Sequence, residues 1–500
     1  MKHTILHIIL SVCLTGVGYA QQLKSDVVIT GQIIGAIPNI VEFTVPVNGI
    51  NYFGFEDAVS VDSTGGFRLS VNMDRPAIIE LSKGYTSYGS IIAMPGATYE
   101  VAIDHRKEKP TIIVHGQDEA GQALYNQLPN RSMPIGDFDA GAAQYRQDSV
   151  ATQIETGIKQ RLKAELFRFD SLLEKNLISD DFYHLVKNDR TYFYYGVQGT
   201  VGFLNKLLSQ RNQNVMDEAS YIPLWSSIFE KEPVTHPELL RSPWFFYYTE
   251  LFLRYQYLIV ESTSFDTLTA AREQGAIHTH NIQTAINHLP EPQLEYYYAA
   301  YLYYNAINRN YEKELLTLFE QFKTTYPQSK YTAFIEPEII HIIGFHEKKE
   351  RSTNPEIRFL ENPREMNSLA ELAGQLEGKQ FYVDVWATWC SPCKDEFRYN
   401  TELISLLRDK NIIPIYISID KNDRAELWHD MVHYYELEGY HIHANDSLVD
   451  DLLQLRGDDP FTIPWHFLVD QAGTIVRKYV NGPSNIGKLA QELDGEADPD

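Results

Sequence analysis

A strand-like apolar run leads into a Cys-x-x-Cys pair in the C-terminal third of this 500-residue chain. Residues 381–385, with the sequence FYVDV, are almost continuously apolar, which is expected of a central strand buried on both faces. Cys390 and Cys393 follow, and apolar residues at helical spacing after them predict an amphipathic helix. Strand and helix patterns alternate from residue 355 to 495, so this region is restricted to an α/β fold with a largely parallel sheet.

The N-terminus has the features of a secretory signal. A positively charged start at residues 1–3 precedes a mostly apolar stretch at residues 4–17, and small residues follow up to Ala20. This order predicts a leader of residues 1–20 and export of the mature protein to the periplasm or cell envelope. Lipidation at Cys13 is a less favoured alternative, because Cys13 lies early in the apolar stretch.

The cysteine count indicates that the pair is chemical rather than structural. The chain has 3 cysteines, and Cys13 is lost with the leader if cleavage follows Ala20. A disulfide that closes so small a loop removes little chain entropy, and a chain of this length can bury its own cores without such staples. Cys390 and Cys393 would then be the only thiols of the mature protein.

Charge and hydropathy exclude some classes of partner. The formal net charge is −24 and the pI is about 5.1, which argues against nucleic acid and against anionic membrane surfaces. After the leader, the best candidate for a membrane span is residues 245–260, but Glu250 and Arg254 interrupt it. We therefore expect a buried helix there, in a protein that is not integral to the membrane.

The patterns along the chain predict a multidomain protein. Residues 25–115 carry short alternating strand patterns separated by turns, which predicts an all-β sandwich of antiparallel strands. Residues 118–350 carry helical spacing and predict an all-α region. Within it, the tyrosine-rich residues 296–304 are interpreted as part of a packed helical bundle whose hydroxyls reach water, rather than as an aromatic binding surface. Residues 355–495 form the α/β domain.

A cysteine pair at the start of a helix has a defined chemistry. Thiolate is the reactive form of cysteine, and the free N–H groups and dipole at a helix N-terminus favour an anion at Cys390. Cys393 returns to the same helical face, so it can resolve a mixed disulfide formed by Cys390. Pro392 suits the first helical turn, where its missing N–H costs nothing.

Zinc binding is the main competing interpretation of such a pair. A zinc site needs about four ligands, and the chain has no second cysteine pair. The remaining candidate ligands are two groups of histidines: His429, His433, His441 and His443, and His278, His280 and His288. Solvated helix flanks and loops are the simpler interpretation of both groups, and we expect neither a metal nor another cofactor.

Two further positions are candidates for the reaction. Asp384 interrupts the apolar strand before the pair and could accept the proton of Cys393 when that thiol attacks. The alternative is that Asp384 caps a loop at the strand end. Pro464 precedes another strand and would turn the chain sharply if its peptide bond were cis, and the backbone of Ile463 could pair with an incoming peptide strand.

The sequence VDVWATWCSPCKDEF, followed by the proline-led strand TIPWHFLVD, resembles the thioredoxin superfamily. Within that superfamily it is similar to the exported TlpA/ResA-type disulfide reductases, over roughly residues 355–495. The resemblance implies that Cys390 is the attacking thiol and Cys393 the resolving thiol. It also implies a thioredoxin-like fold in which Pro464 is a cis proline that faces the pair.

The same resemblance assigns roles to residues around the pair. Asp384 matches the buried acid of thioredoxins, although many TlpA-type members have asparagine there. Glu396 matches an acidic residue that ResA-type proteins hold near the site. The expected supporting residues are Trp389, Ser391, Pro392, Glu396 and Ile463. The β region also resembles a domain that often precedes such modules in Gram-negative envelope proteins.

These features predict an exported thiol–disulfide oxidoreductase with a redox disulfide between Cys390 and Cys393. The dipeptide Ser391-Pro392 is nearer to that of reducing thioredoxins than to that of strong oxidants, so a reductase is expected. Its partners would be disulfide-containing exported proteins and a membrane electron-donor protein that recharges the pair. The alternative is an envelope binding protein in which the thioredoxin-like domain is auxiliary, since residues 21–350 show no catalytic pattern.

Overall fold

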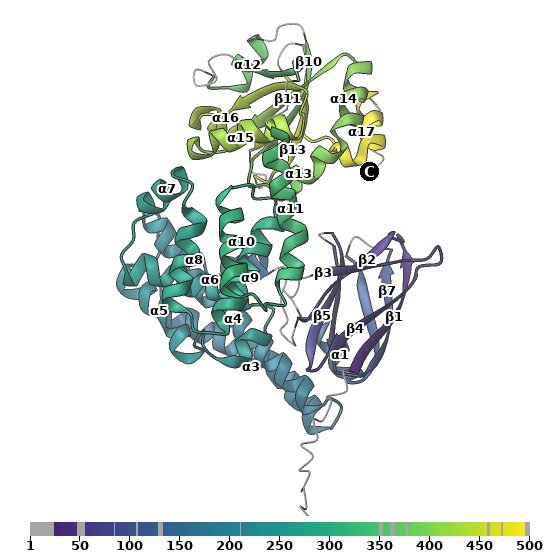
Figure 1. The fold of residues 1–500 in the computed structure, drawn as a ribbon, viewed down its shortest axis with the longest axis vertical. Coiled ribbons are helices and arrows are strands. Elements are labelled where there is room, and N and C mark those ends of the chain that lie inside the picture. The colour runs from purple at the N-terminus through teal and green to yellow at the C-terminus, as the bar shows by residue number, and fades with distance from the viewer. Residues whose placement is uncertain are drawn as a thin grey trace, which may run out of the picture.

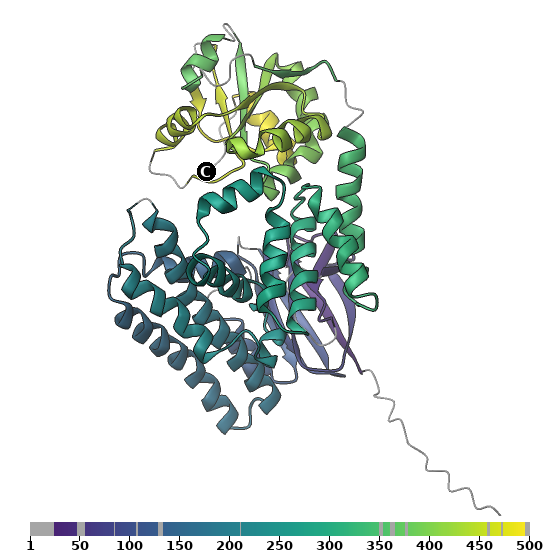
Figure 2. The same cartoon turned by 60° about the vertical axis from the view of Figure 1, so that its left-hand side comes forward.

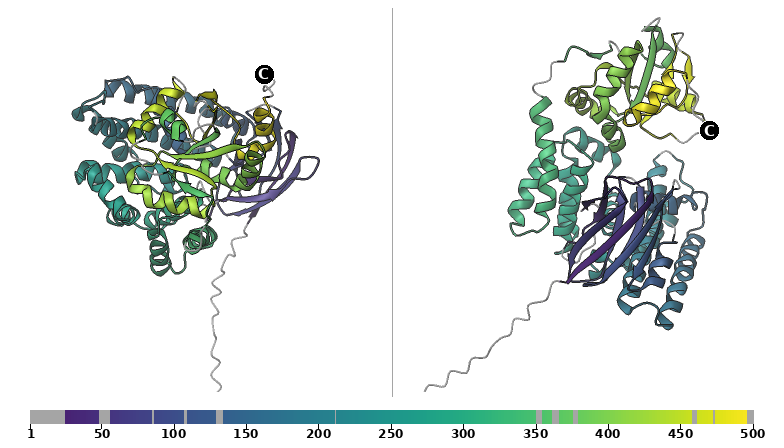
Figure 3. Two further views of the ribbon diagram at one scale, coloured as in Figure 1. Left: turned by 90° about the horizontal axis from the view of Figure 1, so that it is seen from above. Right: turned by 90° about the vertical axis from the view of Figure 1, so that its right-hand side faces the viewer.

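The computed structural model describes residues 25–47, 56–84, 86–106, 109–128, 134–210, 212–349, 354–360, 366–375, 379–457, 461–471 and 474–495. The predicted leader, with Cys13, lies outside the described residues. The described chain has a β-rich N-terminal region, a large helical middle and a C-terminal α/β region (Figure 1). The β region lies along one side of the helices, and the α/β region lies across one end of them (Figure 2). Figure 3 shows this arrangement from above and from the side.

The N-terminal region consists of two sheets that enclose one core. Its strands are β1 (Ser25–Gly35), β2 (Ile40–Thr44), β3 (Glu56–Ser60), β4 (Gly66–Met73), β5 (Ala77–Lys83), β6 (Thr86–Ala93), β7 (Thr98–His105) and β8 (Thr111–Gly116). The sheet orders are β4-β1-β7-β8 and β3-β2-β5-β6. One pairing differs from the predicted antiparallel pattern, since β1 and β7 run parallel. The chain reaches β7 through the second sheet rather than through a hairpin, which allows that direction.

The central region is helical. Its helices are α1 (Glu119–Tyr125), α2 (Pro134–Ala143), α3 (Ala151–Glu174), α4 (Asp180–Ser209), α5 (Glu218–Lys231), α6 (Phe245–Tyr255), α7 (Phe265–Glu273), α8 (Ile277–His288), α9 (Gln293–Ile307), α10 (Glu314–Thr325) and α11 (Thr332–Lys349). The stretch 245–260 forms α6 and a following π-helical turn, Gln256–Val260. Among the described residues, no helix combines the length and hydropathy needed to cross a membrane.

The tyrosine-rich helix α9 lies inside the bundle. Tyr296, Tyr297 and Tyr301 are buried, and the ring of Tyr296 stacks on Phe245 of α6 with centroids 4.8 Å apart. Buried aromatic rings contribute large apolar areas and pack in stacked or edge-to-face pairs. The segment therefore packs within the bundle as expected. The expectation that its hydroxyls reach water is wrong for Tyr297 and Tyr298, whose hydroxyls donate to Glu250 and to the Leu318 carbonyl.

The C-terminal region is built on a six-stranded sheet in the order β14-β13-β10-β11-β12-β9. Its elements are β9 (Ile357–Phe359), α12 (Leu369–Gln375), β10 (Gln380–Trp386), α13 (Ser391–Glu396), α14 (Asn400–Asp409), β11 (Ile412–Ser418), α15 (Ala425–Tyr434), β12 (Gly439–His443), α16 (Asp446–Arg456), β13 (Trp465–Val469), β14 (Ile475–Arg477) and α17 (Ile486–Leu493). The strands β9 to β12 pair in parallel, whereas β13 pairs with β10 and with β14 in the antiparallel direction. The sheet is thus largely parallel, as expected, with antiparallel pairings on both sides of β13.

The three regions share apolar cores. One core joins β5 and β6 of the β region to α1, α3 and α4 of the helical region, through residues such as Ile92, Tyr125 and Phe182. Another core is continuous from the helical region into the α/β region, where it includes Cys390 and Cys393. The cysteine pair therefore lies at the boundary between the helices and the α/β sheet. Figure 1 labels α13, the helix that contains Cys393.

Candidate active site

The cysteine pair begins the short helix α13, directly after the central strand β10. Cys390 is the N-cap residue, and its Sγ accepts the N–H of Cys393 at 3.1 Å. The two side chains form a disulfide. Cys390 is 4% exposed and Cys393 is fully buried, so the sulfur of Cys390 is the more accessible of the two. The N–H groups at this helix start can hold an anion at Cys390 when the disulfide is reduced.

The residues around the pair form an exposed rim. Trp389 is 52% exposed, Pro392 is exposed and Ser391 is half-buried. The Ile463–Pro464 peptide bond is cis, and Ile463 packs against the same apolar core as the cysteines. The exposed ring of Trp389, next to Cys390 in the chain, offers apolar contact to an approaching polypeptide.

The loop between β10 and Cys390 is fixed through Thr388. Its N–H and its hydroxyl donate to the two carboxylate oxygens of the buried Asp420, both at 2.8 Å. The hydroxyl also accepts from Arg424 at 2.9 Å, and the carbonyl accepts from Lys394 at 2.9 Å. Because each polar group of Thr388 has a partner, the backbone that leads to Cys390 is held in one position.

Asp384 is buried in β10 and lies opposite His466 of β13 in the sheet register. The distance from Asp384 Oδ1 to His466 Nε2 is 3.4 Å. Neither atom has a hydrogen-bond partner among the described residues. The carboxyl thus lies beside an imidazole inside the sheet.

Sequence reasoning did not identify His466. The available signal was a single polar residue within the apolar run WHFLV that follows Pro464. From that signal alone, the partner of His466 could be any group on either face of the sheet. The register of β10 against β13 supplies the missing information.

Two buried tyrosines lie around Asp384. Burial, followed by the charge of Asp384, raises the pKa of Tyr382 and of Tyr416 well above the ordinary value. The ring of Tyr382 stacks on His466 with centroids 5.6 Å apart, and Tyr416 donates to Asn400 at 2.6 Å. Both phenols are therefore neutral near pH 7.

Glu396 lies at the end of α13 and is half-buried. Its carboxylate accepts the N–H and the hydroxyl of Ser484, at 2.8 and 2.7 Å. A Cβ on Gly482 would lie 2.8 Å from Glu396 Oε2 and also 2.8 Å from His466 Cε1. Because Gly482 has no side chain, the carboxylate of Glu396 and the ring of His466 can both occupy the space beside it.

Lys394 is the second residue that sequence reasoning missed. It follows Cys393 directly and is fully buried, and its ammonium binds backbone carbonyls of the helical region. From the sequence, a lysine after a cysteine pair is expected to be exposed to solvent. The carbonyl groups that bind Lys394 lie far away along the chain, so the sequence does not reveal them.

The two histidine groups pack against other side chains. His429, His433 and His441 surround the ring of Phe359, and His441 Nε2 lies 2.7 Å from the Leu437 carbonyl. Of the second group, His278 lies 2.8 Å from the Tyr301 hydroxyl and 3.6 Å from Glu312, and His288 lies 2.8 Å from Glu261. Within the described ranges, no cluster of three or more His, Cys, Asp or Glu side chains is suited to a metal ion.

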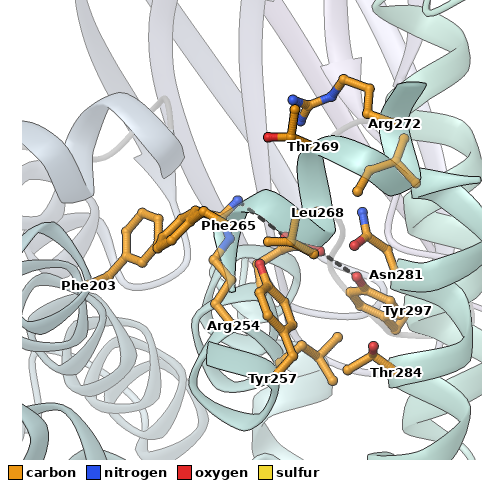
Figure 4. A pocket seen from close by; sticks show the side chains of 13 residues that line it. Phe203, Arg254, Tyr257, Phe265, Leu268, Thr269, Arg272, Asn281, Thr284 and Tyr297 are labelled. Carbon is orange, nitrogen blue, oxygen red and sulfur yellow. Dashed lines mark hydrogen bonds and ion pairs between the residues drawn. The ribbon is translucent and has the colours of Figure 1, made fainter. Parts of the chain in front are cut away.

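A cavity of about 300 Å³ lies in the helical region, between α6, α7 and α8. Figure 4 shows residues of its wall, which include Phe203, Arg254, Tyr257 and Tyr297. Glu250 binds Arg254 at 3.3 Å and accepts the hydroxyl of Tyr297. These three polar groups of the cavity wall therefore bind one another.

Comparison with known proteins relates part of the chain to thiol–disulfide enzymes. No family model matches the chain. The thiol-disulfide oxidoreductase ResA of Bacillus thuringiensis subsp. konkukian is 26% identical over 117 residues, which are 23% of this chain and 63% of that protein. ResA of Bacillus subtilis is 26% identical over 102 residues, which are 20% of this chain and 53% of that protein. The chain thus spans less than two thirds of the length of these curated relatives.

Solved structures give similar partial matches. The thioredoxin domain of a thiol-disulfide oxidoreductase from Bacteroides vulgatus is 24% identical, with a TM-score of 0.21, over 25% of this chain and 84% of that chain. StoA from Bacillus subtilis is 20% identical, with a TM-score of 0.19, over 24% of this chain and 84% of that chain. Each match extends over only part of this chain.

Proposed function

Because the chain contains a thioredoxin-superfamily module of the ResA/TlpA type, we propose that residues 355–495 are this module and that the protein is a thiol–disulfide oxidoreductase. The observation that carries the proposal is the place of Cys390. Its sulfur caps α13, accepts the N–H of Cys393 and lies directly after the central strand of the sheet. That place favours a thiolate at Cys390 and keeps the resolving cysteine within reach.

The proposed reaction is the reduction of a disulfide in an exported protein. The Cys390 thiolate attacks one sulfur of the substrate disulfide, that S–S bond breaks, and the second substrate sulfur leaves as a thiolate that takes up a proton. The Cys393 thiolate then attacks Sγ of Cys390 and releases the first substrate sulfur. Two electrons pass to the substrate, and the protein is left with the Cys390–Cys393 disulfide.

Asp384 is the proposed acceptor of the proton that Cys393 loses before its attack. The carboxyl is buried, and it lies on the strand that leads into the site. A general base in this role must be close to the thiol and shielded from bulk water. The pairing with His466 keeps the carboxyl oriented inside the sheet.

The proposed setting is the periplasm or cell envelope. The leader predicted at residues 1–20 supports export, and an exported reductant must be recharged from the membrane side. We therefore propose a membrane electron-donor protein as the second partner. The exposed Trp389 and the backbone at Ile463 are the proposed contacts for substrate polypeptide.

Reduction of insulin by the full-length protein tests the proposed activity. With dithiothreitol as the electron source, we expect the wild type to accelerate insulin precipitation and Cys390→Ser to abolish the acceleration. Cys393→Ser should instead accumulate a mixed disulfide through Cys390, visible on a non-reducing gel. A wild type without turnover, whose pair also resists reduction, would contradict the proposal.

A further inference from the structure

Lys394 joins the cysteine helix to the helical region. Its Nζ donates to the carbonyl of Asn308 at 2.6 Å, to that of Arg309 at 3.3 Å and to that of Thr388 at 2.9 Å. The side chain is fully buried. A lysine is rarely buried in this way unless its charge and its donors are satisfied, and here backbone carbonyls use all three donors.

The two carbonyl oxygens of the helical region that accept from Lys394 lie at the C-terminal end of a helix. Asn308 is the C-cap residue of α9, and Arg309 follows with a φ of 52°. The last carbonyls of a helix lack partners within the helix and carry the negative end of its dipole, so a cation there is favourable. Lys394, on α13, thus caps a helix of another region of the chain.

Other contacts strengthen the same connection. Arg309 pairs with Asp395 of α13 at 3.0 Å. Arg424 donates both to Glu312 of the helical region and to the hydroxyl of Thr388, each at 2.9 Å. The loop before Cys390 and the helix after it are therefore both held by the helical region.

The charge of Lys394 depends on its surroundings. Burial lowers the pKa of Lys394 to about 7, an effect that the neighbouring cations Arg424 and Arg309 increase and that the carboxylates of Glu312 and Asp420 oppose. The ammonium is hydrogen-bonded to Thr388, two residues before Cys390. A cation close to a thiol favours the thiolate, and a thiolate in turn favours the ammonium form of the lysine.

We propose that the helical region is part of the thiol site, and that Lys394 is a positioning residue that fixes the start of α13 and supplies a cation favouring the thiolate form of Cys390. This inference rests on the proposed thiol–disulfide exchange for its purpose. It predicts the pKa of Cys390 in the reduced protein, and that pKa can be measured without any substrate. It also gives the helical region a role that its own sequence does not reveal.

The test is a titration of the Cys390 thiolate by its absorbance at 240 nm. The full-length reduced protein carries Cys13→Ser and Cys393→Ser, so that Cys390 is its one remaining cysteine. Adding Lys394→Met should raise the pKa of Cys390 by about one unit, which is about tenfold less thiolate below the pKa. Lys488→Met, an exposed lysine of the same region, should leave that pKa unchanged.

Lys394→Gln separates charge from position, and it also serves if the methionine variant fails to fold. Its amide can still donate to a carbonyl of α9, but it carries no charge. We expect the same rise in the pKa of Cys390, with slow hydrogen exchange retained at the end of α9. A rise with methionine but none with glutamine would overturn the role of the cation, and no change in either variant would overturn the inference as a whole.

The two proposals fail in different ways. Loss of insulin reduction in the wild type, with the expected pKa change in the lysine variants, would remove the proposed function and leave the coupling between the regions. Normal insulin reduction, with no pKa change in the lysine variants, would remove the inference about Lys394 and leave the proposed function.

Discussion

At the scale of single residues, the proposed second step needs a base and a nucleophile. Asp384 is the proposed base and Cys393 the proposed nucleophile. Asp384→Asn keeps the size of the side chain but cannot accept the proton. We expect release of substrate from a preformed mixed disulfide at Cys390 to slow by about 100-fold near pH 7. Stopped-flow measurement of that release provides the check.

The rate of the first step, the attack of Cys390 on the substrate disulfide, is the control for this prediction. Attack of Cys390 on a disulfide should change little in Asp384→Asn, because the thiolate of Cys390 is favoured by the start of α13. Asp409→Asn, an exposed carboxyl on α14, should affect neither step. Equal slowing of both steps would show that Asp384 acts through the structure and not as a base.

Some of the residues that the sequence identified depend on near neighbours for their expected chemistry. Cys390, Cys393 and Pro392 act within one helical turn, so spacing alone predicts where they lie. His466 and Lys394 could not be found in the same way. Their roles depend on a strand register and on a helix end that lies far away along the chain.

At the scale of elements, the loop from β10 to α13 is held by Thr388. Thr388→Val keeps the shape of the side chain and removes the hydroxyl that binds Asp420 and Arg424. A buried carboxylate and a guanidinium then each lose a partner, so we expect a loss of about 1–3 kcal/mol in the free energy of unfolding. Urea denaturation measures this loss.

The matched control is Thr401→Val on α14, where the threonine is exposed. Its free energy of unfolding should change by no more than about 0.5 kcal/mol, as is usual for surface substitutions. Equal effects of the two variants would mean that the hydroxyl of Thr388 contributes nothing specific to the loop.

The elements themselves were largely predictable, but the antiparallel pairing of β13 with β10 was not. The apolar run at β10 and the helical spacing after it predict a strand followed by a helix, and both are present. The edge formed by β13 and β14 runs antiparallel, because a short connection joins the two strands and leaves no room for a crossover helix. Part of that connection, residues 472–473, lies outside the described residues.

At the scale of the whole molecule, the contact between the helical and α/β regions contains a carboxylate that depends on pH. Burial alone would raise the pKa of Glu312, but its interaction with His278 and the charge of Arg424 outweigh burial and lower the pKa to about 2. The unfolded state therefore binds this proton more readily. The resulting stability is fully present above about pH 4.5 and is lost as the pH falls towards 2.

We expect Glu312→Gln to remove this pH-dependent part of the free energy of unfolding, which corresponds to about 3 kcal/mol. The measurement is the urea midpoint of each protein between pH 7 and pH 3. The midpoint of the wild type should fall more steeply over this range than that of Glu312→Gln. Glu320→Gln, an exposed residue of α10, should retain the slope of the wild type.

The place of β1 in its sheet has a consequence for the order of folding. β1 is the first described strand of the chain, yet it lies in the interior of its sheet between β4 and β7. Val28 pairs with Ser70 on one side and with Thr98 on the other. Non-local pairing of this kind is slow to form, since a long loop must close first. Because β1 precedes β7 in the chain, it must wait for β7 before its hydrogen bonds are complete, and until then its open edge can pair with another chain.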